Sequence, residues 1–332
     1  MRIAIVKLSA MGDIIHAMLS LQFIKKTNPS VKIDWFVEKA FSGLLQNNAH
    51  IDNIYELDLK SIKKNKIKFF SQVSLIRKYS KNNYDLVIDA QGLIKSAIVS
   101  KLLGKKRVGF SKTSTRESLA SLLYTKKIDS DYSKNVIERN LDVLLKPFNI
   151  SYSKEDILEK EAFLFFNESK KSDDYILKNK KNILLIVGAS WPSKIYSKEK
   201  FAKISNSIDA NFLIAWGSQE EKETAQFISK KSKAIVLPKL ELNDLKEVVS
   251  KVDLLVGNDT GPTHMAWALN IPSITVFGCT PGYRNTYETN INKIIESKSK
   301  VNPEKLKKED FSIQNIDEEK IIEMIKEMLF ES

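Results

Sequence analysis

The stretch LLVGNDTGPTHMAWALN, residues 254–270, decides the fold of this chain. Its first apolar residues predict a buried strand, and an amphipathic helix is expected to begin at Gly261. Between them lie small polar residues, among them Asp259 and Thr260. Where a parallel strand turns into a helix, backbone N–H groups and the positive end of the helix dipole point into the turn, which makes it an anion site.

The polar residues of this turn suit a sugar-phosphate ligand. Asp259 and Thr260 can bond hydroxyl groups, and Gly261 lets a bulky ligand approach the backbone. The pattern leaves an ordinary joint equally open, in which Asp259 or Thr260 only caps the helix. On that helix, His264 could donate a hydrogen bond to an oxyanion or could simply pack beside Met265 and Trp267.

The same strand–helix alternation runs through the chain in two series. Strands are expected at 3–8, 32–37, 86–89 and 107–110, then at 183–187, 212–215, 234–236, 253–256 and 273–277, with helices between them. The break between about residues 149 and 182 predicts an α/β protein with two Rossmann-like parallel-sheet domains facing across a cleft. We expect domains over 1–165 and 175–315, and a C-terminal helix over 316–332 that could pack back on the N-terminal domain.

Composition supports a globular protein. The chain has 332 residues, of which 42% are hydrophobic, enough for two domains rather than one. Its one cysteine cannot form an internal disulfide, and the short apolar run at the N-terminus is too brief for a signal sequence or a membrane span. These features predict a soluble, cytoplasmic protein.

The net charge of +12 is unevenly distributed. Residues 60–84 contain eight Lys and Arg side chains and no carboxylate. Such a field attracts nucleic acid, an anionic membrane or a phosphorylated substrate. A solvated lysine-rich surface is the alternative, and it accounts well for the excess of lysine as a whole.

The first strand–helix loop, KLSAMGDIIHA over 7–17, holds Gly12 where a dinucleotide site needs three glycines, so NAD or FAD is not expected. Asp13 stands at the end of this loop. It could be a general base for a sugar hydroxyl. Residue preferences alone favour it as the N-cap of a helix beginning at Ile14.

The second domain offers groups for a phosphate. In GASWPSK, residues 188–194, Ser190 supplies a hydroxyl and Lys194 a cation for a leaving diphosphate, although a lone loop lysine more commonly faces solvent. The spacing is not that of a Walker A loop. Farther on, Glu221 could bind ribose hydroxyls or complement a helix dipole. The histidines lack companions for a metal site, so we expect no metal and no cofactor.

Taken together and in this order, these segments resemble the lipopolysaccharide heptosyltransferases of glycosyltransferase family 9, most closely those that add the first heptose to Kdo of the inner core. The resemblance spans the chain and rests on IVKLSAMGDIIHAMLSL, DWFVEKAF, YDLVIDAQGLIKSA, RESLASLLY, GASWPSK, AWGSQEE, VLPKLEL and VGNDTGPTHMAWAL. It implies the GT-B fold, an inverting transfer and no metal. The pair Trp191–Pro192 departs from the family pattern.

The resemblance implies a role for each candidate residue. Asp13 would be the base, and Lys194 would help the nucleoside diphosphate leave. The donor, ADP-L-glycero-β-D-manno-heptose, would be bound in the C-terminal domain by Ser190, Glu221, Leu240, Asp259, Thr260, Gly261 and His264. The acceptor, Kdo2-lipid A, would meet the N-terminal domain at Lys60, Lys63, Lys64, Lys95 and Arg116. The enzyme would then sit peripherally on the anionic cytoplasmic face of the inner membrane.

Three rival interpretations remain. A heptosyltransferase II-like enzyme would use another core acceptor, and a nucleotide-sugar epimerase would need no acceptor. A nucleic-acid-binding module would explain the charge but not Asp13, Asp259 or the 188–194 loop, and the chain has no aromatic-rich basic motif of a known RNA-binding type. We therefore expect no nucleic-acid partner.

Overall fold

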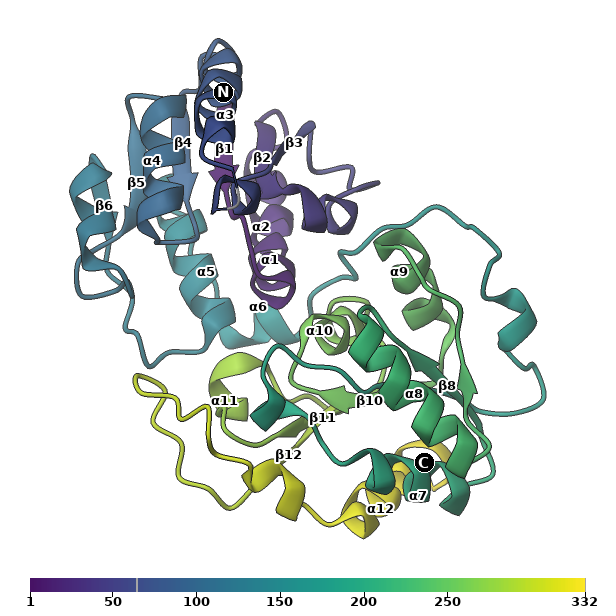
Figure 1. The fold of residues 1–332 in the computed structure, drawn as a ribbon. Helices are drawn as coiled ribbons and strands as arrows, with labels where there is room; N and C mark the ends of the chain where they lie inside the picture. Colours follow the sequence, from purple (N-terminus) through teal and green to yellow (C-terminus); the bar gives the residue numbers. More distant parts are fainter. Residues whose placement is uncertain (64, 332) are drawn as a thin grey trace. The chain divides into compact units, whose positions relative to one another are not determined.

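The computed structural model describes residues 1–63 and 65–331. The chain divides into two compact units, residues 1–165 and 166–332, and each has its own parallel sheet (Figure 1). The expected α/β architecture of two Rossmann-like domains is therefore confirmed.

The sheet of the first unit has the strand order β3-β2-β1-β4-β5-β6. The strands are β1 (Arg2–Val6), β2 (Lys32–Glu38), β3 (Asn53–Leu57), β4 (Leu86–Asp89), β5 (Arg107–Phe110) and β6 (Lys126–Ile128). Ala4, Val6 and Val87 pack with Ile76 and Val99 from the helices α3 (Ile67–Ser80) and α4 (Ile94–Leu103). Because side chains alternate between the two faces of a strand, Ile3 and Ile5 point to the opposite face.

The helices of the first unit form two groups. The helices α1 (Met11–Met18), α2 (Ser20–Thr27) and α5 (Val136–Leu145) pack together, and α6 (Lys154–Leu158) follows α5 in the chain. The helices α3 (Ile67–Ser80) and α4 (Ile94–Leu103) lie side by side, and α4 contacts the 3-10 turn η3 (Ser118–Leu123). Figure 1 labels both groups; shorter turns are η1 (Lys39–Leu44), η2 (Lys60–Lys63) and η4 (Lys146–Phe148).

The second unit repeats the plan with the strand order β12-β11-β10-β7-β8-β9. Its strands are β7 (Asn182–Ile186), β8 (Asn211–Ala215), β9 (Ile235–Val236), β10 (Leu254–Asn258), β11 (Ser273–Phe277) and β12 (Asn292–Glu296). Its helices are α7 (Lys198–Ser207), α8 (Gln219–Lys231), α9 (Leu242–Lys251), α10 (Gly261–Ala268), α11 (Gly282–Asn285) and α12 (Glu318–Phe330), with turns η5 (Asp173–Tyr175), η6 (Pro192–Lys194) and η7 (Ser312–Asn315). β7, β8, β10 and β11 are buried throughout.

The C-terminal helix is part of this second unit rather than a separate segment. α12 packs against α7, and its Ile321, Ile322 and Ile325 are buried in the core that also contains Phe201. Lys203 of α7 adds ion pairs to Glu318 and Glu319. The apolar side of α12 is therefore buried within the second unit.

Six helices and strands were not expected from the sequence: β3, α3, β6, α6, α11 and β12. The three strands are short and partly exposed, so they lack a continuous apolar run. Helix α3 buries Ile76 and exposes Ile67, Phe69 and Phe70, so its apolar residues do not follow one buried face. Among the described residues, no helix is both long and apolar enough to cross a membrane.

Candidate active site

Each sheet reverses its winding direction at one place. In the first unit this place lies between β1 and β4, and in the second it lies between β7 and β10. In open parallel sheets, ligands bind beyond the carboxyl ends of the strands at this reversal. The first turn of α1, which follows β1, carries Asp13, and the segments after β7 and β10 carry Lys194 and Asp259.

Asp13 is half-buried in the first turn of α1. The interpretation of Asp13 as an N-cap is wrong, because α1 begins at Met11 and Ala10 occupies the N-cap position. The Asp13 carboxylate still bonds to the helix end, since its Oδ2 accepts the Ala10 N–H at 3.2 Å.

Gln91, which sequence reasoning missed, holds the loop before Asp13. The Gln91 side-chain oxygen accepts the N–H groups of Leu8 and Ser9, both at 3.1 Å. Gly92 follows with a φ of 69°, a backbone conformation in which a side chain would be strained. The motif YDLVIDAQGLIKSA thus contains the residue that clamps the loop before Asp13.

Lys7 is buried at the end of β1, and its ammonium donates to the Ala90 carbonyl at 2.8 Å. Burial lowers the pKa of Lys7, while the nearby carboxylates of Asp13 and Asp89 act in the opposite direction. Burial also raises the pKa of Asp89, although Tyr124 donates to its carboxylate at 2.7 Å. A cation therefore lies close to the candidate base.

In the second unit, Lys194, Asp259 and His264 meet in one buried network. The Lys194 Nζ lies 2.6 Å from Asp259 Oδ2, and their side chains are 12% and 5% exposed. His264 Nε2 lies 3.2 Å from Asp259 Oδ1. Burial by itself would raise the pKa of Asp259, but Lys194 and the hydrogen-bonded His264 outweigh it and hold that pKa well below its usual range.

This arrangement corrects two local interpretations. Lys194 is not a solvent-facing loop lysine, because η6 turns its ammonium onto Asp259. Neither Asp259 nor Thr260 caps α10 with its side chain: Thr260 occupies the N-cap position without a side-chain capping bond, and the Asp259 carboxylate bonds elsewhere. As expected, α10 begins at Gly261.

Asn258, Thr280 and Asn285 complete the network, and the sequence reasoning missed all three. The amide of Asn258 donates to the Val187 carbonyl at 2.9 Å, which ties the end of β10 to the residue after β7. Thr280 and Asn285 donate to Asp259 Oδ2 at 2.8 and 3.3 Å. Thr280 and Asn285 follow β11, the neighbour of β10. Because the carboxyl ends of parallel strands lie together, their position in the chain could have indicated these two residues.

Glu221 joins two loops at the start of α8. Its Oε2 accepts the N–H groups of Gly217 and Ser218 at 2.6 and 3.2 Å, so it complements the helix end. The other oxygen faces Gly188, where an added Cβ would lie only 2.1 Å from it. Nearby, Ser190 is exposed in the loop after β7, and Leu240 is half-buried before α9.

Two of the basic residues expected to bind the acceptor, Lys60 and Lys95, act on the charge of Glu38, which is buried at the end of β2. Burial raises the pKa of Glu38, and the charges of Lys95 and Lys60 oppose this shift. Arg116 is exposed before η3. Lys63 ends η2, and Lys64 lies outside the described residues.

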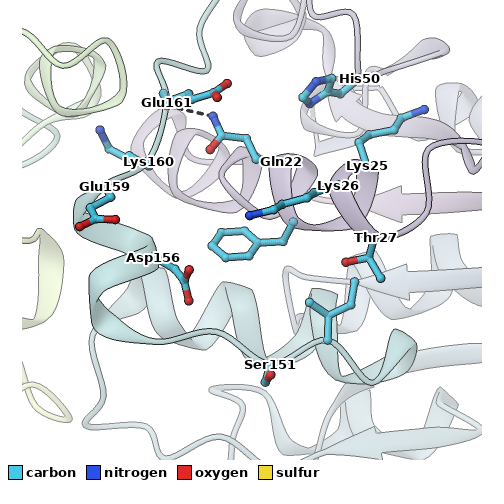
Figure 2. A pocket seen from close by; sticks show the side chains of 12 residues that line it. Gln22, Lys25, Lys26, Thr27, His50, Ser151, Asp156, Glu159, Lys160 and Glu161 are labelled. Carbon is cyan, nitrogen blue, oxygen red and sulfur yellow. Dashed lines mark hydrogen bonds between the residues drawn. The ribbon is translucent and has the colours of Figure 1, made fainter.

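A pocket of about 770 Å³ also lies in the first unit (Figure 2). Its lining comes from α2, His50 and residues 150–161, and Gln22 donates to the Glu161 carbonyl at 2.9 Å. None of the candidate site residues lines this pocket. Both α2 and His50 lead into the beginnings of strands, so the pocket lies at the edge of the sheet opposite to Asp13.

Comparisons with known proteins agree with this geometry. The family model "Glycosyltransferase family 9 (heptosyltransferase)" matches residues 72–313. Lipopolysaccharide heptosyltransferase 1 of Campylobacter coli is 41% identical, with 99% of each chain covered. The E. coli heptosyltransferase WaaC with ADP superposes with a TM-score of 0.80 at 23% identity, covering 99% of this chain and 100% of its own. Its structure with ADP-2-deoxy-2-fluoro heptose gives a TM-score of 0.79 at 23% identity, with 98% and 99% covered.

The match to the family model covers well over half of the chain, and the Campylobacter coli relative aligns over nearly its whole length. The two sheets are those of the GT-B heptosyltransferases. The chain is a glycosyltransferase, and it belongs to glycosyltransferase family 9, the heptosyltransferases.

Proposed function

We propose that this protein transfers L-glycero-D-manno-heptose from ADP-L-glycero-β-D-manno-heptose to Kdo of Kdo2-lipid A, with inversion at the anomeric carbon. The observation that carries the proposal is the buried Lys194–Asp259–His264 network at the switch point of the second sheet. The proposal is further supported by the Campylobacter coli relative, a lipopolysaccharide heptosyltransferase 1, and by the structure of WaaC with ADP-2-deoxy-2-fluoro heptose.

The second unit would bind the donor. Lys194 and the N-terminus of α10 at Gly261 face the diphosphate, with Ser190 and Thr260 as hydroxyl partners and His264 beside them. Glu221 takes the ribose, Leu240 borders the adenine, and Asp259 takes heptose hydroxyls. Asp259 is ionised and held in place by Thr280 and Asn285, so it can accept hydroxyl hydrogens without reorganising.

The first unit would bind the acceptor and supply the base. Asp13 takes the proton from the acceptor hydroxyl as that oxygen forms a bond to the anomeric carbon. On the opposite side of that carbon, the bond to the diphosphate oxygen breaks and ADP leaves with the electron pair. Lys194 and the amide end of α10 stabilise the charge that develops on the departing diphosphate. A single displacement from the opposite side inverts the configuration.

Lys60, Lys63, Lys64, Lys95 and Arg116 would meet the phosphates and carboxylates of the acceptor. The acceptor is a lipid of the inner membrane, so the enzyme would work peripherally on the cytoplasmic face of that membrane. The basic field of residues 60–84 fits an anionic lipid surface.

The test is to mix the purified protein with ADP-heptose and Kdo2-lipid A and to detect an added heptose by mass spectrometry, with the anomeric configuration read by NMR. Asp13→Ala should slow transfer by roughly 100- to 10,000-fold and leave the Kd for ADP-heptose unchanged. Asp129→Ala, which removes an exposed carboxylate of the same unit, is the matched control and should transfer normally.

Three outcomes would contradict the proposal. The first is the absence of a heptosylated product, and the second is a retained anomeric configuration. The third is transfer only to a core acceptor that already carries a heptose, which would indicate a heptosyltransferase II-like enzyme. If Asp13→Ala weakens donor binding as much as it slows transfer, Asp13 has a structural role instead.

A further inference from the structure

The first unit exposes large apolar side chains mainly on one group of elements. Ile67 and Phe70 of α3 are 79% and 75% exposed, and Leu119 and Leu122 of η3 are 63% and 72% exposed. Phe69 of α3, and Ile94 and Ile98 of α4, are also exposed. The other large apolar side chains exposed in the described part of this unit are Met1 and Leu158.

These side chains share one edge of the fold. α3 follows β3, α4 follows β4 and η3 follows β5, and all three strands are parallel. The beginnings of α3 and α4 therefore lie at the carboxyl edge of the sheet, the edge that also carries Asp13. The Ile94 N–H donates to the Glu117 carboxylate at 2.7 Å, which joins η3 to the start of α4. We call this surface the α3–α4–η3 face; Figure 1 labels α3 and α4.

Positive charge predominates on the α3–α4–η3 face, although Asp58 pairs with Lys68 of α3 at 3.3 Å and Glu117 accepts the Ile94 N–H. Neither residues 60–84 nor residues 90–116 contain a carboxylate. Exposed Lys66 directly precedes α3, Lys95 lies on α4, and exposed Arg116 precedes η3. Apolar side chains surrounded by lysine and arginine are the composition of segments that lie in the interface of an anionic membrane.

We propose that the α3–α4–η3 face docks on an anionic lipid bilayer, with Ile67, Phe69 and Phe70 inserted among the head groups. A second copy of the chain would bring two cationic surfaces together, which charge repulsion disfavours. Lipid phosphates satisfy the charge, and the acyl region accepts the aromatic rings. The proposal rests on the proposed function in one respect, namely that the acceptor hydroxyl must reach the same edge of the sheet from a membrane lipid.

The experiment measures binding of the purified full-length protein to vesicles by co-sedimentation. Vesicles of phosphatidylcholine alone are compared with vesicles containing phosphatidylglycerol, at low and high salt. Phe69→Ser/Phe70→Ser should weaken binding to the anionic vesicles by at least about tenfold. Lys66→Glu should weaken it by roughly 30-fold at low salt and by less at high salt.

Matched controls lie in the second unit. Phe311→Ser removes a phenylalanine that is 50% exposed, and Lys305→Glu reverses an exposed lysine. Both should bind vesicles like the unmodified protein. All variants are also assayed with a water-soluble Kdo acceptor without acyl chains, on which the Phe69/Phe70 variant should keep its turnover and lose it only with Kdo2-lipid A in vesicles.

The vesicle-binding, light-scattering and turnover measurements each test a different part of the proposal. Equal binding to anionic and neutral vesicles, or unchanged binding of the Phe69/Phe70 variant, would overturn the docking surface. A shift from dimer to monomer in that variant, measured by light scattering and without loss of vesicle binding, would assign the face to a second copy instead. No turnover of the unmodified protein on the soluble acceptor would count against the proposed function, and the vesicle result would still decide the docking surface.

Discussion

The buried pair of Lys194 and Asp259 can be tested by a double-mutant cycle. The two charged atoms lie 2.6 Å apart, and both side chains are almost fully buried. Breaking a buried pair by removing one partner costs about 3–5 kcal/mol, because the remaining charge is left without its counterion. The loss of stability in Lys194→Met should lie at the lower end of this range, since Thr280 and Asn285 still donate to Asp259. The loss in Asp259→Asn should lie at the upper end, since the buried Lys194 ammonium then faces only a neutral amide.

The double variant carries no charge at either position, so it should lose much less stability than the sum of the single variants. We expect a coupling energy of about 3 kcal/mol. The assay is urea unfolding followed by tryptophan fluorescence, because Trp191, Trp216 and Trp267 lie in the second unit and Trp35 alone lies in the first. The unfolding transition of the second unit is the one to be fitted.

Lys203→Met is the control, since it removes a more exposed lysine of the same unit that pairs with Glu318 and Glu319. It should cost less than about 1 kcal/mol. Losses that add to within about 0.5 kcal/mol in the double variant would refute the coupling. Titration with ADP provides a second measurement: Lys194→Met should bind ADP more weakly, and unchanged ADP affinity together with unchanged transfer would remove Lys194 from the donor site.

Three further predictions follow from single positions. Gly188→Ala should destabilise the second unit by about 1–3 kcal/mol and weaken ADP binding, because its Cβ would displace the Glu221 carboxylate. Gly217→Ala is the control, since its Cβ would lie 3.4 Å from that carboxylate. Equal urea midpoints for the two variants would contradict the prediction. Burial lowers the pKa of Lys160 to about 8, against an ordinary value of 10.5. Below pH 8 the Lys160 ammonium is charged in both the folded and the unfolded state, so its burial destabilises the folded state in full. This destabilisation disappears as the pH rises from about 8 to about 10.5. Lys160→Met should therefore stabilise the first unit by up to about 3 kcal/mol at pH 7 and by little at pH 10.5, and a pH-independent difference in urea unfolding would count against it. Lys7→Met should lower kcat by about tenfold without changing the KM for ADP-heptose, since it removes the cation beside Asp13, and normal turnover would show that Lys7 is not needed there.

The central elements could be predicted because their signals are local. Strands β7 and β10 are buried throughout, and each contains several consecutive apolar residues. The expected strands at 183–187 and 253–256 agree with the structure to within two residues. β3 and β12 were missed because edge strands bury only part of their length. The start of Asp13's helix was placed too late because Ala10 at the N-cap position gives no capping signal.

The sequence by itself determined the two parallel sheets and the strand–helix connections near which Asp13, Lys194 and Asp259 would lie. Apolar runs and turn residues alternate along the chain, and this signal is local. It left open whether Asp259 would cap its own helix or bond across the fold. Only the tertiary structure decided this, since β7, β10 and β11 are brought side by side from distant parts of the chain. A buried carboxylate takes the partners that neighbouring loops place around it, and here these are Lys194, His264, Thr280 and Asn285.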